Sequence, residues 1–270
     1  MTRARESDAF GSSGQSPMRR RDAIRRLSRD LAVFAGASLI PHRASGQMGG
    51  APDAGLRIAL RLEMLQVTLY RQGLAAFTAG TQALSANELA AMRQIAKHDA
   101  AHVSFLSASL GIGQPVPTPR FDLTGGSGGG NGPFATALTS KAEFLKLAQV
   151  LKDLAVRAYK GQNEAEKLPA DLLTKAMQLH SVEARHAAHV RRLRGQSGWI
   201  VGITATGFTT SVAASGVSQA DIAKLVYQGE DNVTQLGVKI TRIAASQATP
   251  AFDEPLESAA TGTLMGFFNA

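Results

Sequence analysis

The most regular feature of the chain is a set of four long segments in which apolar residues recur at steps of three and four. They cover about residues 54–79, 86–110, 140–161 and 170–195. Such steps place the apolar side chains on one face of a helix, so the pattern predicts four amphipathic helices. The third is predicted to begin at the capping-box sequence Ser140-Lys-Ala-Glu143 and to end near Gly161.

The connections between these segments predict how the helices are arranged. Residues 80–85 and 162–169 form short connections, whereas residues 111–139 form a long one that is rich in Gly and Pro. Short, long, short is the connectivity of a four-helix bundle with one crossover. We expect a surface crossover without a core of its own, so that deleting residues 125–130 changes stability little.

Composition changes after Trp199, where small and β-branched residues become frequent. A shorter helix is predicted from about Ser218, and a partly apolar tail follows it. The sequence therefore predicts an all-α fold in which residues 48–197 form the bundle and residues 198–270 form a helical and irregular extension packed on it.

Charge and cysteine content exclude several classes of function. The chain has no Cys, which removes disulfides and thiolate zinc sites. Its formal net charge is +8, but residues 1–47 hold nine Arg and four acidic residues, leaving 20 basic and 17 acidic residues in the remainder. Nucleic acid is therefore not expected as a partner of the bundle.

The first 47 residues have the layout of an export signal in a disordered leader. The basic stretch MRRRDAIRRLSRD precedes the apolar run LAVFAGASLI and the small residues of PHRASGQ. Arg20-Arg21-Asp22-Ala23-Ile24 resembles the twin-arginine motif, which makes the export machinery an expected partner. We expect a periplasmic or other extracytoplasmic protein whose mature chain starts between about residues 45 and 49, without a transmembrane segment. The other interpretation is a disordered basic tail, and both Met1 and Met18 are candidate start residues.

Charged and polar residues interrupt the apolar stripes at mid-helix. They are Glu63, Asp99, His102, Lys152, Glu183 and His186. A charge that faces a bundle core costs several kcal/mol unless it is paired or bound to metal. Asp99-Ala-Ala-His102 and Glu183-Ala-Arg-His186 each put a carboxylate and an imidazole one turn apart on one face. Such donors suit iron or manganese, and also zinc.

The stretches LEMLQVTLYRQGL, IAKHDAAHVSFL, VRAYKGQ, HSVEARHAAHVRRL, GWI and VYQGEDNVTQLGV give the chain a family resemblance. Over about residues 55–245 it resembles the ferritin-like superfamily, and most closely its bacterial ferritin-like-domain and desiccation-related branch. The resemblance implies a ferritin-like four-helix bundle in which each half gives a Glu on one helix and Glu-x-x-His on the next. Glu63 matches the first Glu, His102 the earlier His, and Glu183 with His186 the last pair. Asp99 stands where that motif has Glu.

Lys152 departs from the family pattern. It lies seven residues before Tyr159, as Glu63 lies seven before Tyr70, so it occupies the position of the Glu on the third helix. One interpretation is a metal site, mononuclear or dinuclear, held by Glu63, Asp99, His102, Glu183 and His186. The second is a metal-free bundle in which the Lys152 ammonium replaces the charge of a metal. The third is an ordinary set of surface charges.

The sequence also allows predictions for other polar residues near these positions. Tyr70, Tyr159, His180 and His189 are expected to surround the ligands, whereas His98 is expected to lie off the stripe and to be exposed. Arg185 and residues 191–194 are expected to form a solvated face.

The resemblance implies protection against oxidative stress or desiccation, through iron or manganese that reacts with dioxygen or peroxide. The alternative is a structural, stress-associated bundle without metal. The sequence does not decide whether the protein is an enzyme and identifies no catalytic residue. A homo-oligomer is compatible with it.

Overall fold

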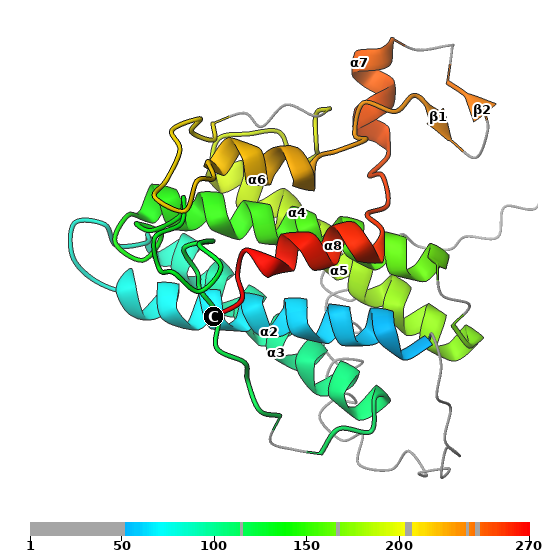
Figure 1. Cartoon of the computed structure of the whole chain (residues 1–270), viewed down its shortest axis with the longest axis horizontal. Coiled ribbons are helices and arrows are strands. Elements are labelled where there is room, and N and C mark those ends of the chain that lie inside the picture. Colours follow the sequence, from blue (N-terminus) through cyan, green and yellow to red (C-terminus); the bar gives the residue numbers. More distant parts are fainter. Residues whose placement is uncertain (1–51, 114–115, 166–167, 203–206, 236–237, 241–243) are drawn as a thin grey trace, which may run out of the picture. The chain divides into compact units, whose positions relative to one another are not determined.

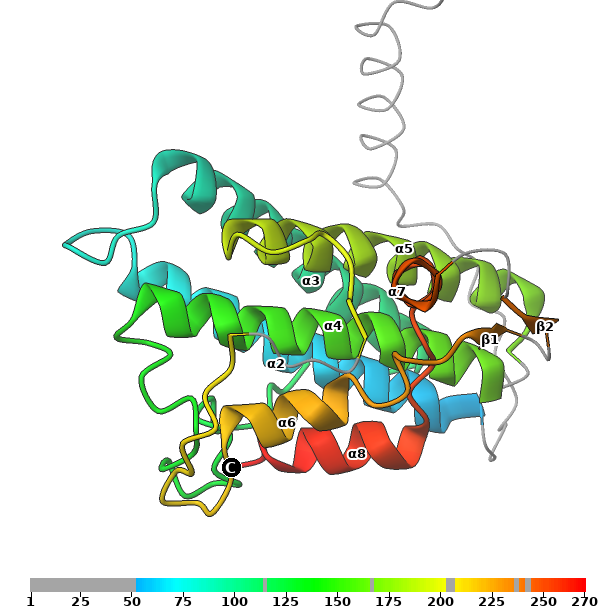
Figure 2. The same ribbon diagram turned by 90° about the horizontal axis from the view of Figure 1, so that it is seen from above.

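Four long helices form the body of the computed structural model, which describes residues 52–113, 116–165, 168–202, 207–235, 238–240 and 244–270. They are α2 (Pro52–Ala76), α3 (Ala86–Ser109), α4 (Lys141–Ala165) and α5 (Ala170–Leu193). The pairs α2/α3 and α4/α5 are helical hairpins, and α2 also packs against α4 (Figures 1 and 2). The predicted all-α fold is therefore confirmed, and the predicted leader lies outside the described residues.

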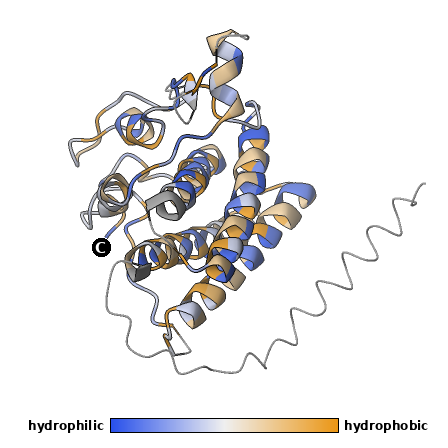
Figure 3. Ribbon diagram, turned by 90° about the vertical axis from the view of Figure 1, so that its right-hand side faces the viewer, coloured by the Kyte–Doolittle hydropathy of each residue, from blue (hydrophilic) through white to orange (hydrophobic). Residues whose placement is uncertain are grey.

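The apolar faces of these helices meet in one main core. Leu62, Leu65 and Leu69 of α2 are fully buried there against Leu147, Leu151 and Leu154 of α4 and their neighbours. Figure 3 shows hydrophobic and hydrophilic residues alternating around individual helices, as amphipathic helices require. Among the described residues, none of the helices has the length and apolar character that crossing a membrane would need.

Side-chain caps mark where several of the helices begin, including α6 (Gln219–Val226), which starts at a complete capping box of Ser218 and Asp221. Ser85 and Glu88 form a complete capping box at the start of α3, which the sequence analysis did not identify. The predicted box at α4 forms only in part. The Ser140 hydroxyl accepts a long bond from the Glu143 N–H at 3.4 Å, but the Glu143 carboxylate binds Lys146 and Gln219 instead. Competition from those two side chains explains the difference.

The crossover between α3 and α4 is an ordered part of the core. The Asp122 carboxylate accepts hydrogen bonds from the N–H groups of Thr124, Gly128 and Gly130, at 2.9–3.0 Å. Phe134 is 1% exposed and belongs to the main core. The prediction that the crossover lies on the surface is therefore wrong at Phe134, although the crossover adds to the main core and does not form a separate one. The buried Asp122 carboxylate gathers the glycine-rich chain that precedes Phe134.

The C-terminal residues pack on the bundle through two of their short helices. They form α6 (Gln219–Val226), strands β1 (Thr234–Gln235) and β2 (Val238–Lys239), α7 (Ala245–Ala248), the 3-10 helix η1 (Thr249–Ala251) and α8 (Ser258–Gly266). The two strands form an antiparallel pair. Both α6 and α8 pack on α4, and α8 also packs on α2 (Figure 2).

Arg157 of α4 links the bundle to these C-terminal residues. Its fully buried guanidinium donates to the Glu254 carbonyl at 2.8 Å and to the carbonyls of Val226 and Gln228, and it pairs with Glu230 at 2.8 Å. A buried charge with this many acceptors strongly constrains the chain segments that supply them. The side chain therefore fixes the segments after α6 and before α8 on the surface of α4.

Gly161 lies inside α4 and does not end it, since the helix continues to Ala165. The backbone of Leu256 passes directly over this glycine, and a Cβ at position 161 would lie 2.1 Å from the Leu256 carbonyl oxygen. The prediction of a helix end is wrong for this reason. The glycine provides room for a second segment of chain, which is the other common use of a residue without a side chain.

Candidate metal centre

Six polar side chains from four helices meet in the middle of the bundle. Glu63, Asp99, Lys152 and Glu183 are 0% exposed, and His102 and His186 are 6% exposed. They come from α2, α3, α4 and α5, each at the point where its apolar stripe is interrupted. The interpretation as surface charges is therefore wrong, since all six residues face one another inside the protein.

Lys152 is the cation at the centre of this cluster. Its ammonium lies 2.7 and 2.8 Å from the two oxygens of Asp99 and 2.9 Å from Glu183 Oε2. Burial alone would lower the pKa of Lys152, but the charges of Asp99 and Glu183 outweigh it and raise that pKa above its ordinary value. The side chain therefore stays charged and links α4 to α3 and α5.

His102 lies between two carboxylates on the other side of the cluster. Its Nδ1 is 3.1 Å from Glu63 Oε1 and 3.4 Å from Glu183 Oε1. Burial would lower the pKa of His102, but hydrogen bonds and charges from Glu183 and Glu63 outweigh it and raise that pKa to about 10. Without a metal ion, His102 is thus a second cation of the cluster.

The two glutamates differ in their electrostatic surroundings. Burial works against ionisation of Glu183, but Lys152 and hydrogen bonds from His102 and His186 hold its pKa well below the usual range. Burial, together with the charge of Glu183, raises the pKa of Glu63 instead. Of the two glutamates, Glu63 is the less compensated, and its Oε2 is buried without a hydrogen-bond partner among the described residues.

His186 connects the cluster to a histidine that the sequence analysis placed outside it. His186 Nδ1 lies 3.1 Å from Glu183 Oε1, and His186 Nε2 lies 2.9 Å from His98 Nδ1. The two rings stack with centroids 5.2 Å apart. The prediction that His98 is exposed is wrong, because the ring folds inward onto His186. His98 precedes His102 by four residues, and this spacing could have placed it near the same helix face.

The two tyrosines also border the cluster. The Tyr159 hydroxyl donates to Glu63 Oε1 at 2.8 Å. The Lys152 ammonium lies 5.5 Å from the centroid of the Tyr70 ring, and the Tyr70 hydroxyl has no partner among the described residues. Burial raises the pKa of both phenols, so both stay protonated. Tyr159 therefore orients Glu63, and Tyr70 provides an aromatic face for Lys152.

The structure places His180 and His189 differently from the two tyrosines. His180 is half-buried and its Nδ1 bonds to the Val156 carbonyl at 3.0 Å, while His189 is exposed on α5. Within the described part of the chain, no hydrogen bond or ion pair joins either ring to the cluster. The two tyrosines thus border the cluster, whereas these two histidines lie away from it.

The donor set fits one divalent cation. Glu63, Asp99, His102 and Glu183 each offer a ligand atom, and these atoms lie within 4.8 Å of one another. When His102 gives up its proton to act as a ligand, three carboxylates and the Lys152 ammonium leave a charge of −2, which one divalent ion balances. Lys152 lies at the position from which a carboxylate on α4 would bind a second ion, and the unpartnered Glu63 Oε2 is available to the first.

Comparison with known proteins identifies the family. The model of the ferritin-like domain matches residues 54–196, which is more than half of the chain and covers α3, α4, α5 and all but the first two residues of α2. The chain therefore belongs to the ferritin-like family. No curated protein and no solved structure matches it. The family match does not separate the desiccation-related branch from other ferritin-like proteins.

Proposed function

We propose that this chain is an exported ferritin-like protein that binds a single iron or manganese ion through Glu63, His102 and Glu183, with Asp99 and His186 beside them. The observation that carries the proposal is Glu63 Oε2, which is buried and has no hydrogen-bond partner among the described residues. It belongs to a group of three carboxylates, Glu63, Asp99 and Glu183, that faces a single ammonium, that of Lys152. Oxygen and imidazole donors of this kind suit either metal.

The chain's own residues orient these donors. Lys152 holds Asp99 and one oxygen of Glu183, which leaves Glu183 Oε1 directed towards His102. Tyr159 holds Glu63 Oε1. The complete burial of these carboxylates keeps bulk water from them. When bound, iron or manganese supplies reactivity towards dioxygen or peroxide, and we assign the protein to protection against oxidative stress or desiccation.

A second candidate function is a metal-free, structural bundle that stabilises itself or partners in the cell envelope under stress. Two contacts favour it. The Lys152 ammonium already bonds to two carboxylates, and a protonated His102 already lies between Glu63 and Glu183. In this case the cluster is a buried ion network with one uncompensated carboxylate oxygen.

Metal analysis of natively exported protein tests the first proposal. We expect about one iron or manganese ion per chain, and we expect Glu63→Gln to lose it because the amide cannot supply an anionic ligand. The ion should raise the melting temperature, since a ligand at 100 times its Kd stabilises the folded state by ~2.7 kcal/mol. Glu257→Gln, at an exposed carboxylate, is the matched control.

The alternative outcomes separate the two candidates. A chain that contains no metal, and whose melting temperature is the same in chelator and in added ferrous or manganous ion, would establish the metal-free bundle. Two ions per chain would overturn the view that Lys152 takes the place of one of them.

Export through residues 1–47 is part of the proposal. In the double variant Arg20→Lys, Arg21→Lys we expect precursor to accumulate in the cytoplasm, because the twin-arginine route reads paired guanidinium groups. The matched control is Arg25→Lys with Arg26→Lys, which changes a neighbouring arginine pair. Cell fractionation and N-terminal sequencing give the readout. Normal export of the first double variant, or a mature chain that starts at residue 1, would contradict export by this route.

A further inference from the structure

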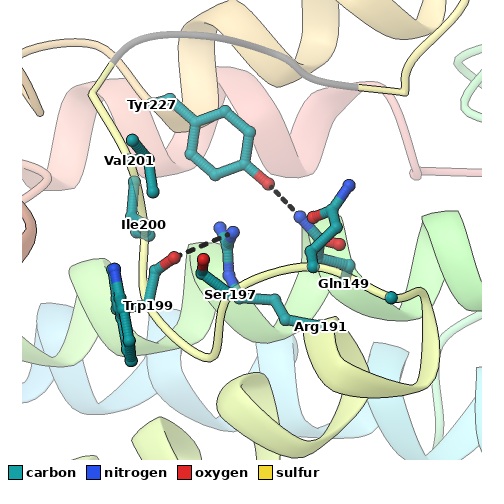
Figure 4. A pocket seen from close by; sticks show the side chains of 9 residues that line it. Gln149, Arg191, Ser197, Trp199, Ile200, Val201 and Tyr227 are labelled. Carbon is teal, nitrogen blue, oxygen red and sulfur yellow. Dashed lines mark hydrogen bonds between the residues drawn. The ribbon is translucent and has the colours of Figure 1, made fainter.

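A second polar site lies at the C-terminal end of α5, separate from the candidate metal centre. It is a cavity of about 320 Å³ (Figure 4). Its wall is formed by Gln149, Arg191, Gly195, Gln196, Ser197, Trp199, Ile200, Val201 and Tyr227. A volume of this size is at the lower end of the range for small-molecule sites.

The floor of this cavity is a buried network around Asp153. Arg191 donates to both oxygens of Asp153, the Tyr227 hydroxyl donates to Asp153 Oδ2 at 2.8 Å, and Gln149 donates to the Tyr227 oxygen at 3.0 Å. Arg191 is only 6% exposed, so the expectation of a solvated face is wrong at this position. The ion pair with Asp153 explains why a charged residue is buried there.

This network leaves hydrogen-bond donors on the cavity side. A guanidinium has five N–H donors, and Arg191 directs its remaining terminal nitrogen only to the Trp199 carbonyl, in a long contact of 3.4 Å. A carboxamide has two N–H donors, and one from Gln149 goes to Tyr227. The exposed Ser197 hydroxyl lies on the same wall (Figure 4). The cavity therefore offers donors to an acceptor-rich group.

The charge around the cavity favours an anion. None of its lining residues is acidic. Burial would lower the pKa of Arg191, but the charge of Asp153 outweighs it and raises that pKa, so the guanidinium stays charged. Arg194 does not line the cavity, but its guanidinium bonds to the oxygen of Gln149, which does, and lies 4.8 Å from the centroid of the Phe208 ring. Asp153 pairs with Arg191 and balances its charge, so what the site offers an anion is the remaining N–H donors of a charged guanidinium.

The rim of the cavity is flat and apolar. Trp199 is 52% exposed and Val201 is 50% exposed, which is unusual for side chains of this size. Trp199, Ile200 and Val201 follow one another along one side of the cavity, opposite Gln149 (Figure 4). An indole with one free face is suited to stacking on a planar ring.

We propose that this cavity binds a small aromatic monocarboxylate, with its ring against Trp199 and its carboxylate on the donors of Arg191 and Gln149. The guanidinium and amide donors, in a cavity without acidic lining residues, select the carboxylate, and the exposed indole selects the ring. The volume accommodates one such ring with its acid group. The site is independent of the bundle centre, so it stands or falls without the metal proposal.

Trp199 is the single Trp of the chain, so its fluorescence reports on this cavity alone. Titrating the full-length protein with benzoate is expected to give a saturable change, with a Kd on the order of 1 mM, as suits a ligand of this size. Acetate lacks the ring and benzyl alcohol lacks the charge, and each is expected to bind at least ~10-fold more weakly. Linear quenching without saturation, or equal binding of benzyl alcohol, would overturn the proposal.

Two variants locate the binding site. Arg191→Lys keeps a positive charge beside Asp153 but removes the planar donor edge, and Ser197→Phe fills the cavity from an exposed position without disturbing the network. Each is expected to weaken benzoate binding at least ~10-fold. Ser104→Phe, at an exposed serine of α3, is the matched control and should bind as the parent does. Parent-like binding by a correctly folded Ser197→Phe would show that benzoate binds elsewhere.

Discussion

Replacing Lys152 by methionine is expected to lower the free energy of unfolding by about 3–5 kcal/mol in the absence of metal, as is typical when one partner of a buried charge set is removed. Methionine fills similar space, so the loss is mainly electrostatic. Asp99 loses the cation on both of its oxygens, and Glu183 loses one of its three partners. Chemical denaturation in chelator measures the effect. Lys97→Met, at an exposed lysine of α3, is the control and should change stability little.

Lys152→Glu separates the two candidate functions more sharply. In chelator it is expected to be less stable than Lys152→Met, because it adds a fourth carboxylate to three that are already buried. The same substitution completes the family's ligand set on α4. Added ferrous or manganous ion is therefore expected to raise the melting temperature of Lys152→Glu strongly and that of the parent less, by binding to the folded state. Metal content should rise from about one ion per chain to two.

Two results would contradict this account of Lys152. If metal fails to stabilise Lys152→Glu, the cluster does not bind metal even when α4 supplies a carboxylate in place of the ammonium. If Lys152→Met is as stable as the parent in chelator, the ammonium does not compensate Asp99 and Glu183 as the 2.7–2.9 Å contacts indicate.

Sequence periodicity predicted the residues that converge, because it reports which face of a helix is buried. Glu63, Asp99, Lys152 and Glu183 each stand where an apolar residue would be expected, and one common core is the simplest place for four such interruptions. Periodicity does not report the partners of a side chain. It therefore left open whether Lys152 binds carboxylates or lies opposite a metal ion, and only the distances show the ion pairs.

The features that the sequence analysis missed depend on contacts between distant parts of the chain. Asp153 and Arg191 look like ordinary surface charges of α4 and α5, and their burial depends on Tyr227, which follows α6. The glycine-rich crossover looks unstructured because glycine has no side chain to pack. Its order comes from backbone N–H groups that converge on Asp122, and composition does not reveal such an arrangement.

Gly161 is a single position at which a contact between distant parts of the chain changes the expected result. Helix propensity and the structure predict opposite effects of Gly161→Ala on stability. Alanine is favoured over glycine inside a helix by about 1 kcal/mol, so helix propensity alone predicts that Gly161→Ala stabilises α4. The structure predicts the reverse. The new Cβ would lie 2.1 Å from the Leu256 carbonyl oxygen and 2.6 Å from its carbonyl carbon, and backbone atoms cannot rotate away as a flexible side chain could.

The expected loss of stability in Gly161→Ala follows from the contacts of the segment around Leu256, which the new Cβ would displace. Leu256 is 4% exposed and its N–H donates to the Arg157 carbonyl at 3.0 Å. The neighbouring Glu254 carbonyl accepts from the Arg157 side chain. Losing the burial of one leucine costs roughly 1.5–3 kcal/mol, and leaving a buried donor unpaired costs ~1–3 kcal/mol. After the gain in helix propensity of about 1 kcal/mol is subtracted, we expect Gly161→Ala to be destabilised by about 1.5–5 kcal/mol.

Gly262→Ala is the matched control, because Gly262 lies inside α8 with open space where its Cβ would be. There the propensity gain is unopposed, and we expect stabilisation of up to about 1 kcal/mol. Urea denaturation of both variants measures the change in the free energy of unfolding, which should fall for Gly161→Ala and rise for Gly262→Ala. Limited proteolysis should cut Gly161→Ala first within residues 252–257. If both substitutions stabilised the protein, the segment around Leu256 would not lie on α4 as described, and Arg157 would need other partners for its buried charge.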